Sequence, residues 1–522
     1  DDSKNNSNNN DNNIGIKPSS IIDINGKTDI KWEYIVNLSK RKENEAKNLN
    51  ILRNKLLNAQ DIKGLSEASS DVERQELMKK KLELCCVICN FKNEQIDGDE
   101  AQRIENKKDL LLEVLQCMSA NKWNSIELLS QCIKTVDNNL FRSLPDASMI
   151  KTDNSDDEMD FRDPSWDHLQ LIYELTFHVV TNTHIEKKVM KKYLQGKFLE
   201  NLIHLFSSSD DREPQYVKII VHAIYGRFMA LRKQIRKHLS NYCYSYVYTS
   251  KFRETTSWQG LPEILEIFCS IFQGLNVPVK PDYHLVLRNV VVPLHKSFHL
   301  DEFHEQLLQC CTQFVTKCPM AAPVILGGIL KFWPTVSPLK EQLFITEIVH
   351  ILNVCERHPS MQINNDDDDD DEKDLNNNEL NEYNNTTIKC LEQFIKCMSS
   401  SHHQVAERSL MVWRDETIRN CVDKHKNIIF PKIYKALTYN KEHYWLQAIR
   451  NINRQILTDF KRRDPDYFNK IEIECEREIE VQTKKYNYSM EQANIANLNN
   501  KNKIRNNKWN NIKKIANKNR NK

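Results

Sequence analysis

The clearest hydrophobic pattern in this chain runs from Tyr216 to Phe272. In its first part, apolar residues recur at steps of three and four, which is the spacing of one face of an α-helix. That face consists of Val217, Ile220, Val221, Ile224, Phe228, Leu231, Ile235 and Leu239. A second stripe with the same steps lies on a neighbouring face and consists of His222, Tyr225, Arg232 and Arg236.

The next segment, GLPEILEIFCSIFQG, has a similar double character. One stripe suits a core and contains Leu261, Leu265, Phe268 and Phe272, and a second apolar edge contains Ile264, Ile267 and Ile271. Two adjacent helices that each carry an extra stripe are compatible with a groove for an extended peptide with apolar anchors and an acidic residue. The alternative is that each extra stripe packs on the next helix of a stacked helical protein, and the pattern alone favours this alternative.

Three segments share one plan, which is an apolar helix end, a short polar break and a second amphipathic helix. They cover residues 201–228, 327–354 and 392–418. This is the helix–turn–helix unit of HEAT-type repeats, whose period is about 40–47 residues. Because one such unit cannot bury its own apolar face, neighbouring units stack. The fold is therefore predicted to be all-α, a curved solenoid of HEAT-like repeats with disordered termini.

Composition sets the domain boundaries. Residues 1–30 are rich in Asn and Asp and are predicted to be disordered, and residues 31–70 are charged and predicted to be marginally structured. The solenoid is expected over 71–485, interrupted at 364–385 by an acidic, solvated loop. Residues 486–522 are predicted to form a charged helix and a basic, Asn-rich tail.

Local signals predict where several helices begin and end. Ser70 or Asp71 is suited to cap a first helix that continues through the segment ELMKKKLELCCVICNF. Asp163 followed by Pro164 predicts a cap and a first helical position for the helix that contains Trp166.

The composition of all 522 residues excludes several classes of protein. Only 10 Gly and 15 Pro accompany 40% hydrophobic residues, whereas phosphate-cradling and all-β folds need more glycine for their turns. A net charge of +2 does not indicate a polyanion binder, and no nucleic acid is expected as a partner. The 15 scattered cysteines are typical of buried thiols in a reducing compartment. No stretch resembles a membrane span of about 20 apolar residues, and no secretory leader is visible in a sequence that begins at Asp1. We therefore expect a cytoplasmic or nuclear protein.

The sequence shows no apparatus for catalysis. Cys86 and Cys89 form a CxxC without the second ligand pair of a zinc site, and their apolar helical setting favours core packing. His295 and His299 are four residues apart, with His304, Cys310 and Cys311 downstream, but no Glu lies between the first two as in HExxH. Phosphate-binding and nucleophile motifs are likewise missing. We expect no enzyme, no cofactor and no metal site.

Several long motifs give the chain a family resemblance. These are DPSWDHLQLIYEL, KKYLQGKFLENLIHLF, HAIYGRFMALRKQIRK, VVVPLHK, LKFWP, HHQVAERSLMVW and KWNNIKKIANKN. They are similar to the B-prime (B56) regulatory subunits of protein phosphatase 2A, over roughly 71–519. The resemblance implies a HEAT-like solenoid without catalysis of its own. It also implies a heterotrimer with the phosphatase scaffold and catalytic subunits, and recruitment of substrate and adaptor proteins through short LxxIxE motifs.

By this resemblance, a groove on the concave side holds the motif. Its matching positions here are His222, Tyr225, Arg232, Ile267, Ile271 and Lys280, with Arg236 and Ile264 as auxiliary positions. Tyr225 and the isoleucines would line pockets for the Leu and Ile of the peptide. His222 and Arg232 would bind its backbone and acidic groups, and Lys280 would attract acidic or phosphorylated residues further along.

Two departures from the family pattern concern this groove. Ala223 stands where the family usually has an arginine that pairs with the glutamate of the motif, and Tyr283 stands at a position that is often histidine. The first departure predicts weaker binding or an altered preference at the acidic position. The alternative function is a solenoid transport or scaffold adaptor for other peptide signals, although the eight tryptophans do not recur at matched places as an import receptor requires.

Overall fold

The computed structural model describes residues 48–91, 97–120, 123–144, 161–248, 258–358 and 370–478. The segments predicted to be disordered (1–30) and to form the basic tail (486–522) lie outside these residues. Contacts divide the chain into two compact units. The first unit contains the described residues up to 144, those of Asp153–Leu205, and Asp210–Arg232, and the second contains Phe206–Ser209 and the described residues of Lys233–Lys522.

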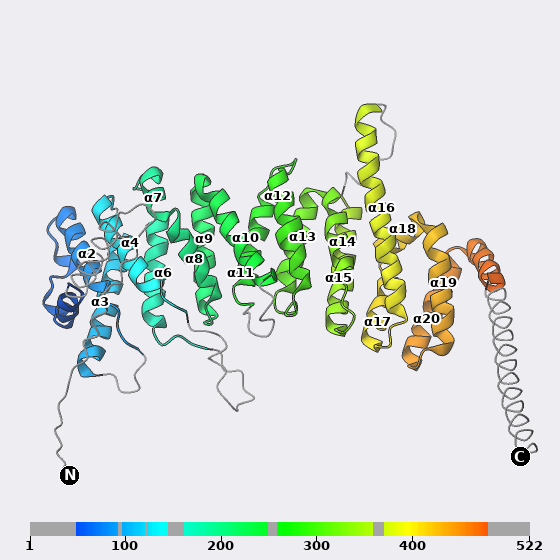
Figure 1. Cartoon of the computed structure of the whole chain (residues 1–522), viewed down its shortest axis with the longest axis horizontal. Coiled ribbons are helices and arrows are strands. Elements are labelled where there is room, and N and C mark those ends of the chain that lie inside the picture. The colour runs from blue at the N-terminus through cyan, green and yellow to red at the C-terminus, as the bar shows by residue number, and fades with distance from the viewer. Residues whose placement is uncertain are drawn as a thin grey trace, which may run out of the picture. The chain divides into compact units, whose positions relative to one another are not determined.

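The first unit is built from helices that pack on one another in order (Figure 1). α2 packs on α4, α4 on α6 and α6 on α9, while α3 lies against both α2 and α6. The helices are η1 (Ala59–Asp61), η2 (Leu65–Glu67), α2 (Asp71–Cys85), α3 (Gly98–Ala120), α4 (Ile126–Leu140), α6 (Trp166–Thr181), α7 (Lys187–Leu194), α8 (Lys197–His204), α9 (Arg212–Arg227) and η4 (Met229–Leu231). The short η3 (Leu205–Ser207) follows α8.

The second unit continues the same plan with two rows of helices. α11, α13, α15, α17 and α20 pack in succession in one row, and α14, α16 and α19 pack in succession in the other. The helices are α10 (Arg232–Tyr248), α11 (Leu261–Gln273), α12 (Pro281–Val286), η6 (Leu287–Val291), η7 (Val292–Lys296), α13 (His304–Lys317), η8 (Pro319–Ala321), α14 (Ala322–Lys331), α15 (Pro338–Glu356), α16 (Asp370–Met398), α17 (His403–Val412), α18 (Glu416–Lys424), α19 (Lys426–His443) and α20 (Gln447–Arg463). A last helical stretch covers 465–478.

Among the described residues all regular structure is helical, and within each unit successive helix pairs stack. This confirms the prediction of an all-α solenoid of HEAT-like repeats. The apolar stripe found in the sequence forms the core of these stacks, since Val217, Ile220, Ile224 and Leu239 expose 1% or less of their surface. The predicted cap of α2 is also confirmed, because the Ser70 hydroxyl accepts a hydrogen bond from the Glu73 amide at 3.2 Å.

Gly260 fixes the start of α11. Its φ of +75° lies in the left-handed region, and a Cβ at this position would come 2.3 Å from the Phe206 carbonyl oxygen. Only glycine fits so close an approach of two backbones. The Tyr242 hydroxyl donates to the Gln259 carbonyl at 2.8 Å, which ties α10 to the same turn.

Three local predictions are wrong. α6 begins at Trp166 rather than at Pro164, because the Asp163 carboxylate bonds to Ser165 instead of capping the helix. α2 ends at Cys85, so Cys89 lies beyond the helix. The predicted loop 364–385 is helical from Asp370 onward as part of α16. There, Tyr383 is 2% exposed and its hydroxyl bonds to Glu356, which secures this polar stretch to α15.

Candidate functional site

Three of the predicted groove residues belong to the first unit, around the junction of α9 and α10. His222 is exposed on α9, whereas the side chain of Tyr225 is 9% exposed. Arg232 donates from Nε to the Tyr225 carbonyl at 2.9 Å, and its guanidinium lies 5.1 Å from the centre of the Tyr225 ring. The structure therefore brings Tyr225 and Arg232 together and holds the guanidinium in a fixed place. Ala223, between His222 and Ile224, is half-buried.

The other predicted groove residues belong to the second unit. Ile264, Ile267 and Ile271 on α11 expose 0%, 1% and 5% of their surface. This burial is what packing on neighbouring helices produces, so their role in peptide binding stays a prediction. Lys280 is exposed at the residue before α12.

One auxiliary cation also has a defined place in the second unit. The guanidinium of Arg236 on α10 lies 4.8 Å from the centre of the Tyr283 ring on α12. Such a contact between a cation and an aromatic face is attractive. The ring of Tyr283, one of the two departures from the family pattern, therefore helps to hold the Arg236 guanidinium next to α12.

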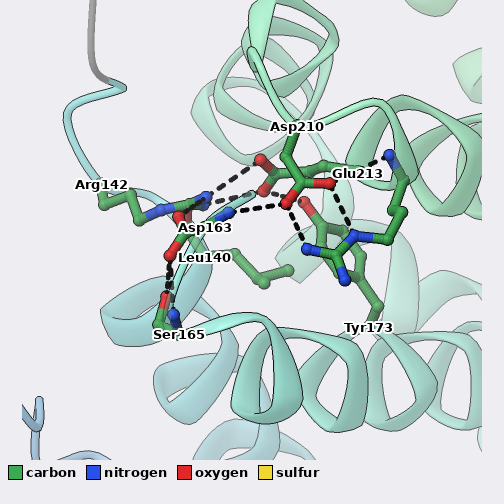
Figure 2. A network of polar contacts seen from close by, with 8 residues as sticks. Leu140, Arg142, Asp163, Ser165, Tyr173, Asp210 and Glu213 are labelled. Carbon is green, nitrogen blue, oxygen red and sulfur yellow. Dashed lines mark hydrogen bonds and ion pairs between the residues drawn. The ribbon is translucent and has the colours of Figure 1, made fainter. Parts of the chain in front are cut away.

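The first unit contains a buried set of charged groups that the sequence did not predict, which we call the arginine network (Figure 2). At its centre the guanidinium of Arg142, just after α4, donates to both oxygens of Glu213 at 2.8 and 3.0 Å. The same guanidinium donates to Asp163 at 2.9 Å. Glu213, in the first turn of α9, has no exposed surface. Two-pronged pairing of this kind satisfies a buried carboxylate well.

Further members complete the arginine network, namely Ser165, Tyr173, Asp210 and Arg212. The Tyr173 hydroxyl on α6 donates to Glu213 at 2.7 Å, and Asp210 accepts from the Asp163 amide at 2.8 Å and from Arg212. Figure 2 shows the labelled side chains converging: Glu213 from the start of α9, Tyr173 from α6, and Asp163 and Ser165 from the residues before α6. The network thereby connects Arg142 and Asp163 to each other and to the helices α6 and α9.

The electrostatic balance of the arginine network favours the charged forms. Burial alone would raise the pKa of Asp163, but hydrogen bonds from Ser165 and the charge of Arg142 lower it overall. Burial would lower the pKa of Arg142, and the carboxylates of Glu213 and Asp163 reverse this and raise it. The Arg142 guanidinium has no lone pair to offer a metal and already occupies oxygens of Glu213 and Asp163, so the network acts to hold these elements together.

The second unit contains another buried polar group, the histidine cluster, made of His295, His304, Cys311 and Glu347. The Glu347 carboxylate on α15 lies 2.9 Å from Nε2 of His295 and, through its other oxygen, 2.9 Å from Nε2 of His304. Nδ1 of His295 lies 2.8 Å from the Val292 carbonyl. Ligand atoms of His295, Cys311 and Glu347 all lie within 4.8 Å of one another, and all three residues are buried.

Burial and pairing oppose each other in the histidine cluster. Burial by itself would raise the pKa of Glu347, but the two imidazoles outweigh it and lower the pKa to about 2. Burial would lower the pKa of His295, and the Glu347 carboxylate raises it instead. Burial raises the pKa of the Cys311 thiol well above its usual value. The cluster is thus a buried carboxylate held between two histidine rings, with a buried thiol beside it.

The sequence named three members of this cluster but missed Glu347, which comes 52 residues after His295. The available signal was a carboxylate inside an apolar stripe, since Phe344, Ile348 and Ile351 on the same helix are fully buried. His299 is not in the cluster. Cys86 and Cys89 are buried in the first unit, where the Cys86 sulfur lies 3.5 Å from the Thr135 hydroxyl, in agreement with packing. Within the described ranges, none of the helices is both long and apolar enough to cross a membrane.

Comparisons with known proteins identify the family. The model of the B56 family, described as protein phosphatase 2A regulatory B subunits, matches residues 64–366 and 372–516. The B′ beta isoform of the 57 kDa regulatory subunits of this phosphatase from Arabidopsis thaliana is 34% identical over 413 residues, which are 78% of this chain and 76% of that protein. The 55 kDa B′ delta isoform of the same plant is 33% identical over 401 residues, which are 76% and 78% of the two chains.

Among solved structures, an engineered protein aligns with a TM-score of 0.28 and 10% identity over 78% of this chain and 99% of that one, too low a score to inform the fold. The family match is different in kind, since it leaves only residues 367–371 unmatched between 64 and 516. From this match and the two plant relatives, the chain belongs to the B56 family of protein phosphatase 2A regulatory subunits.

Proposed function

We propose that this chain is a non-catalytic regulatory subunit that assembles with the scaffold and catalytic subunits of protein phosphatase 2A and selects substrates for them. The observation that carries the proposal is the family match over residues 64–366 and 372–516. The chain matches two plant relatives over about three quarters of their length. Both relatives are named as regulatory subunits of this phosphatase. A regulatory subunit acts by binding, which is the task that stacked helical repeats perform with extended surfaces.

The proposed mode of substrate selection is binding of LxxIxE-type short motifs in proteins that carry them. In the first unit the contacts are His222, Tyr225 and Arg232. The geometry of Arg232 supports this role, because its Nε bond to the Tyr225 carbonyl and its position over the Tyr225 ring fix the guanidinium before a ligand arrives. A cation that is already positioned loses little side-chain entropy on binding a carboxylate.

In the second unit the proposed contacts are Ile267, Ile271 and Lys280, with Arg236 and Ile264 as auxiliary residues. Lys280 is exposed and acts by attracting negative charge near the motif. The isoleucines are 5% exposed or less, so the proposal gives them the role of apolar surface beneath the peptide rather than of projecting side chains. Arg236 rests on Tyr283, which keeps its charge close to α12.

Ala223 is expected to weaken recognition of the acidic position of the motif. A hydrogen bond between charged groups contributes about 1.5–3 kcal/mol. Restoring a cation with Ala223→Arg should therefore tighten binding about tenfold or more.

The test is a fluorescence anisotropy titration of a labelled LxxIxE peptide against the full chain. His222→Ala and Arg232→Ala are expected to abolish binding, and Ala223→Arg is expected to strengthen it. Lys197→Ala removes another exposed cation of the first unit, on α8, and is the matched control that should bind like the unchanged chain. Equal binding by all four variants would contradict the proposed contacts.

Assembly is tested separately by mixing the chain with purified scaffold and catalytic subunits and analysing the mixture by size-exclusion chromatography. Co-elution of the three proteins is expected, and the chain alone should show no phosphatase activity. Peptide binding without assembly would instead favour an adaptor outside the phosphatase. Assembly without peptide binding would agree with the regulatory role and would contradict the proposed binding of LxxIxE motifs.

A further inference from the structure

The protons of the histidine cluster can be assigned from its contacts. A carbonyl oxygen only accepts, so Nδ1 of His295 carries a hydrogen that it donates to Val292 at 2.8 Å. Nε2 of the same ring faces the Glu347 carboxylate at 2.9 Å. Two lone pairs cannot face each other in a dry interior, so a positive particle must lie between them. That particle is either a proton or a metal ion.

The donors that surround this position are those that zinc prefers. Imidazole nitrogen, thiolate sulfur and carboxylate oxygen are its usual protein ligands. His295, Cys311 and Glu347 provide one of each within 4.8 Å of one another. Bonding of Nδ1 to a backbone carbonyl is also how a metal-binding histidine is usually oriented, because it leaves Nε2 free for the ion.

We propose that Nε2 of His295, Sγ of Cys311 and one carboxylate oxygen of Glu347 bind a zinc ion. His304 keeps its hydrogen bond to the other oxygen of Glu347 and orients that ligand from outside. A water molecule completes the four positions of the ion. The site lies between η7, α13 and α15, so the ion would join two successive helix pairs of the second unit.

Charge balance supports a dication at this place. When Zn²⁺ binds, the His295 imidazolium loses one proton and the Cys311 thiol loses another, and both go to solvent. Zinc, one thiolate and one carboxylate then sum to zero charge, which suits a site whose three ligands are fully buried. Binding therefore exchanges two protons for one dication.

The neighbouring thiol of Cys310 is not placed to bind the same ion. Cys310 is as fully buried as Cys311, but it does not belong to the cluster. It therefore provides a matched control that removes a buried thiol from the same helix turn. The edge of the cluster is His304, whose side chain is 8% exposed, so ion entry is expected to be slow.

The experiment uses the full chain, treated with a chelator and then incubated with Co²⁺ or Zn²⁺ at raised temperature to allow entry. Co²⁺ bound to a thiolate gives a charge-transfer band in the near ultraviolet, and metal analysis after gel filtration gives the Zn²⁺ content. We expect the band and about one zinc ion per chain in the unchanged protein and in Cys310→Ser. Cys311→Ser should lose the band, and His304→Asn should weaken zinc binding about 10–100-fold. Circular dichroism checks that every variant is folded.

A second readout is the release of about two protons per ion in a weakly buffered solution, which follows from the exchange above. A band that survives in Cys311→Ser would overturn the proposed ligands. Failure of the folded, unchanged chain to take up either ion would overturn the site itself and show that a proton occupies the position. Neither outcome affects peptide binding or assembly, which are measured with other residues.

Discussion

The arginine network and the histidine cluster solve the same problem with different chemistry. Each contains a glutamate without exposed surface, Glu213 in the first unit and Glu347 in the second. Glu213 is paired with a guanidinium, which is protonated at every pH a protein survives. Glu347 is paired with imidazoles and a thiol, which can give up or shift a proton. A permanent cation makes a clamp, whereas exchangeable donors make a site whose charge can be rearranged.

The largest effect that separates the two clusters is expected from Glu213→Gln. The new amide nitrogen would face the Arg142 guanidinium, donor against donor, and the guanidinium would lose one of its two carboxylates. Breaking a buried pair in this way costs about 3–5 kcal/mol. Chemical denaturation of the variant, with the free energy of unfolding compared with that of the unchanged chain, measures the loss. A cost below that of the matched change in the histidine cluster would contradict the comparison.

Asp163→Asn is expected to have an intermediate effect that depends on pH. Asp163 accepts from Arg142 and Ser165, so its loss should cost about 1.5–3 kcal/mol at pH 7. The folded pKa of this carboxyl is lowered, so its contribution is fully present above the unfolded value of about 3.9 and disappears as pH falls through the folded one. Unfolding measured at pH 7 and at a pH below the unfolded value of about 3.9 should show the difference between variant and unchanged chain shrinking. If the difference instead grew in acid, the pKa of Asp163 in the folded protein would have to be raised rather than lowered.

Glu347→Gln, measured with a chelator present, is expected to cost only about 1 kcal/mol. If His295 gives up its second proton, Nε2 can accept from the new amide group, while the amide oxygen accepts from His304. The same substitution that breaks the arginine network is therefore absorbed by the histidine cluster. With zinc added, the unchanged chain should gain stability that the variant does not, if the proposed ion binds. An equally severe loss in both glutamine variants would show that the imidazoles cannot rearrange.

The fold could be predicted from the sequence because helical periodicity is a local property, and the stripe around Val217 and Leu239 reports it directly. The two polar clusters could not, since they join residues 71 apart, as in Arg142 and Glu213, or 52 apart, as in His295 and Glu347. The helical start of α16 was missed for a related reason. Its polar composition suggests a solvated loop, while the burial of Tyr383 depends on a contact with Glu356 that no local pattern reveals.

The smallest effect is expected at an exposed pair, which tests whether burial is what makes the two clusters matter. Lys79 on α2 and Glu127 on α4 lie 2.6 Å apart, but 44% and 77% of their side-chain surfaces are exposed. Water screens such a pair, and ordering two long side chains offsets what attraction remains. Lys79→Met should therefore leave the free energy of unfolding within experimental error of the unchanged chain. A loss as large as that of Glu213→Gln would mean that connecting α2 to α4, rather than the burial of charge, decides the stability of the first unit.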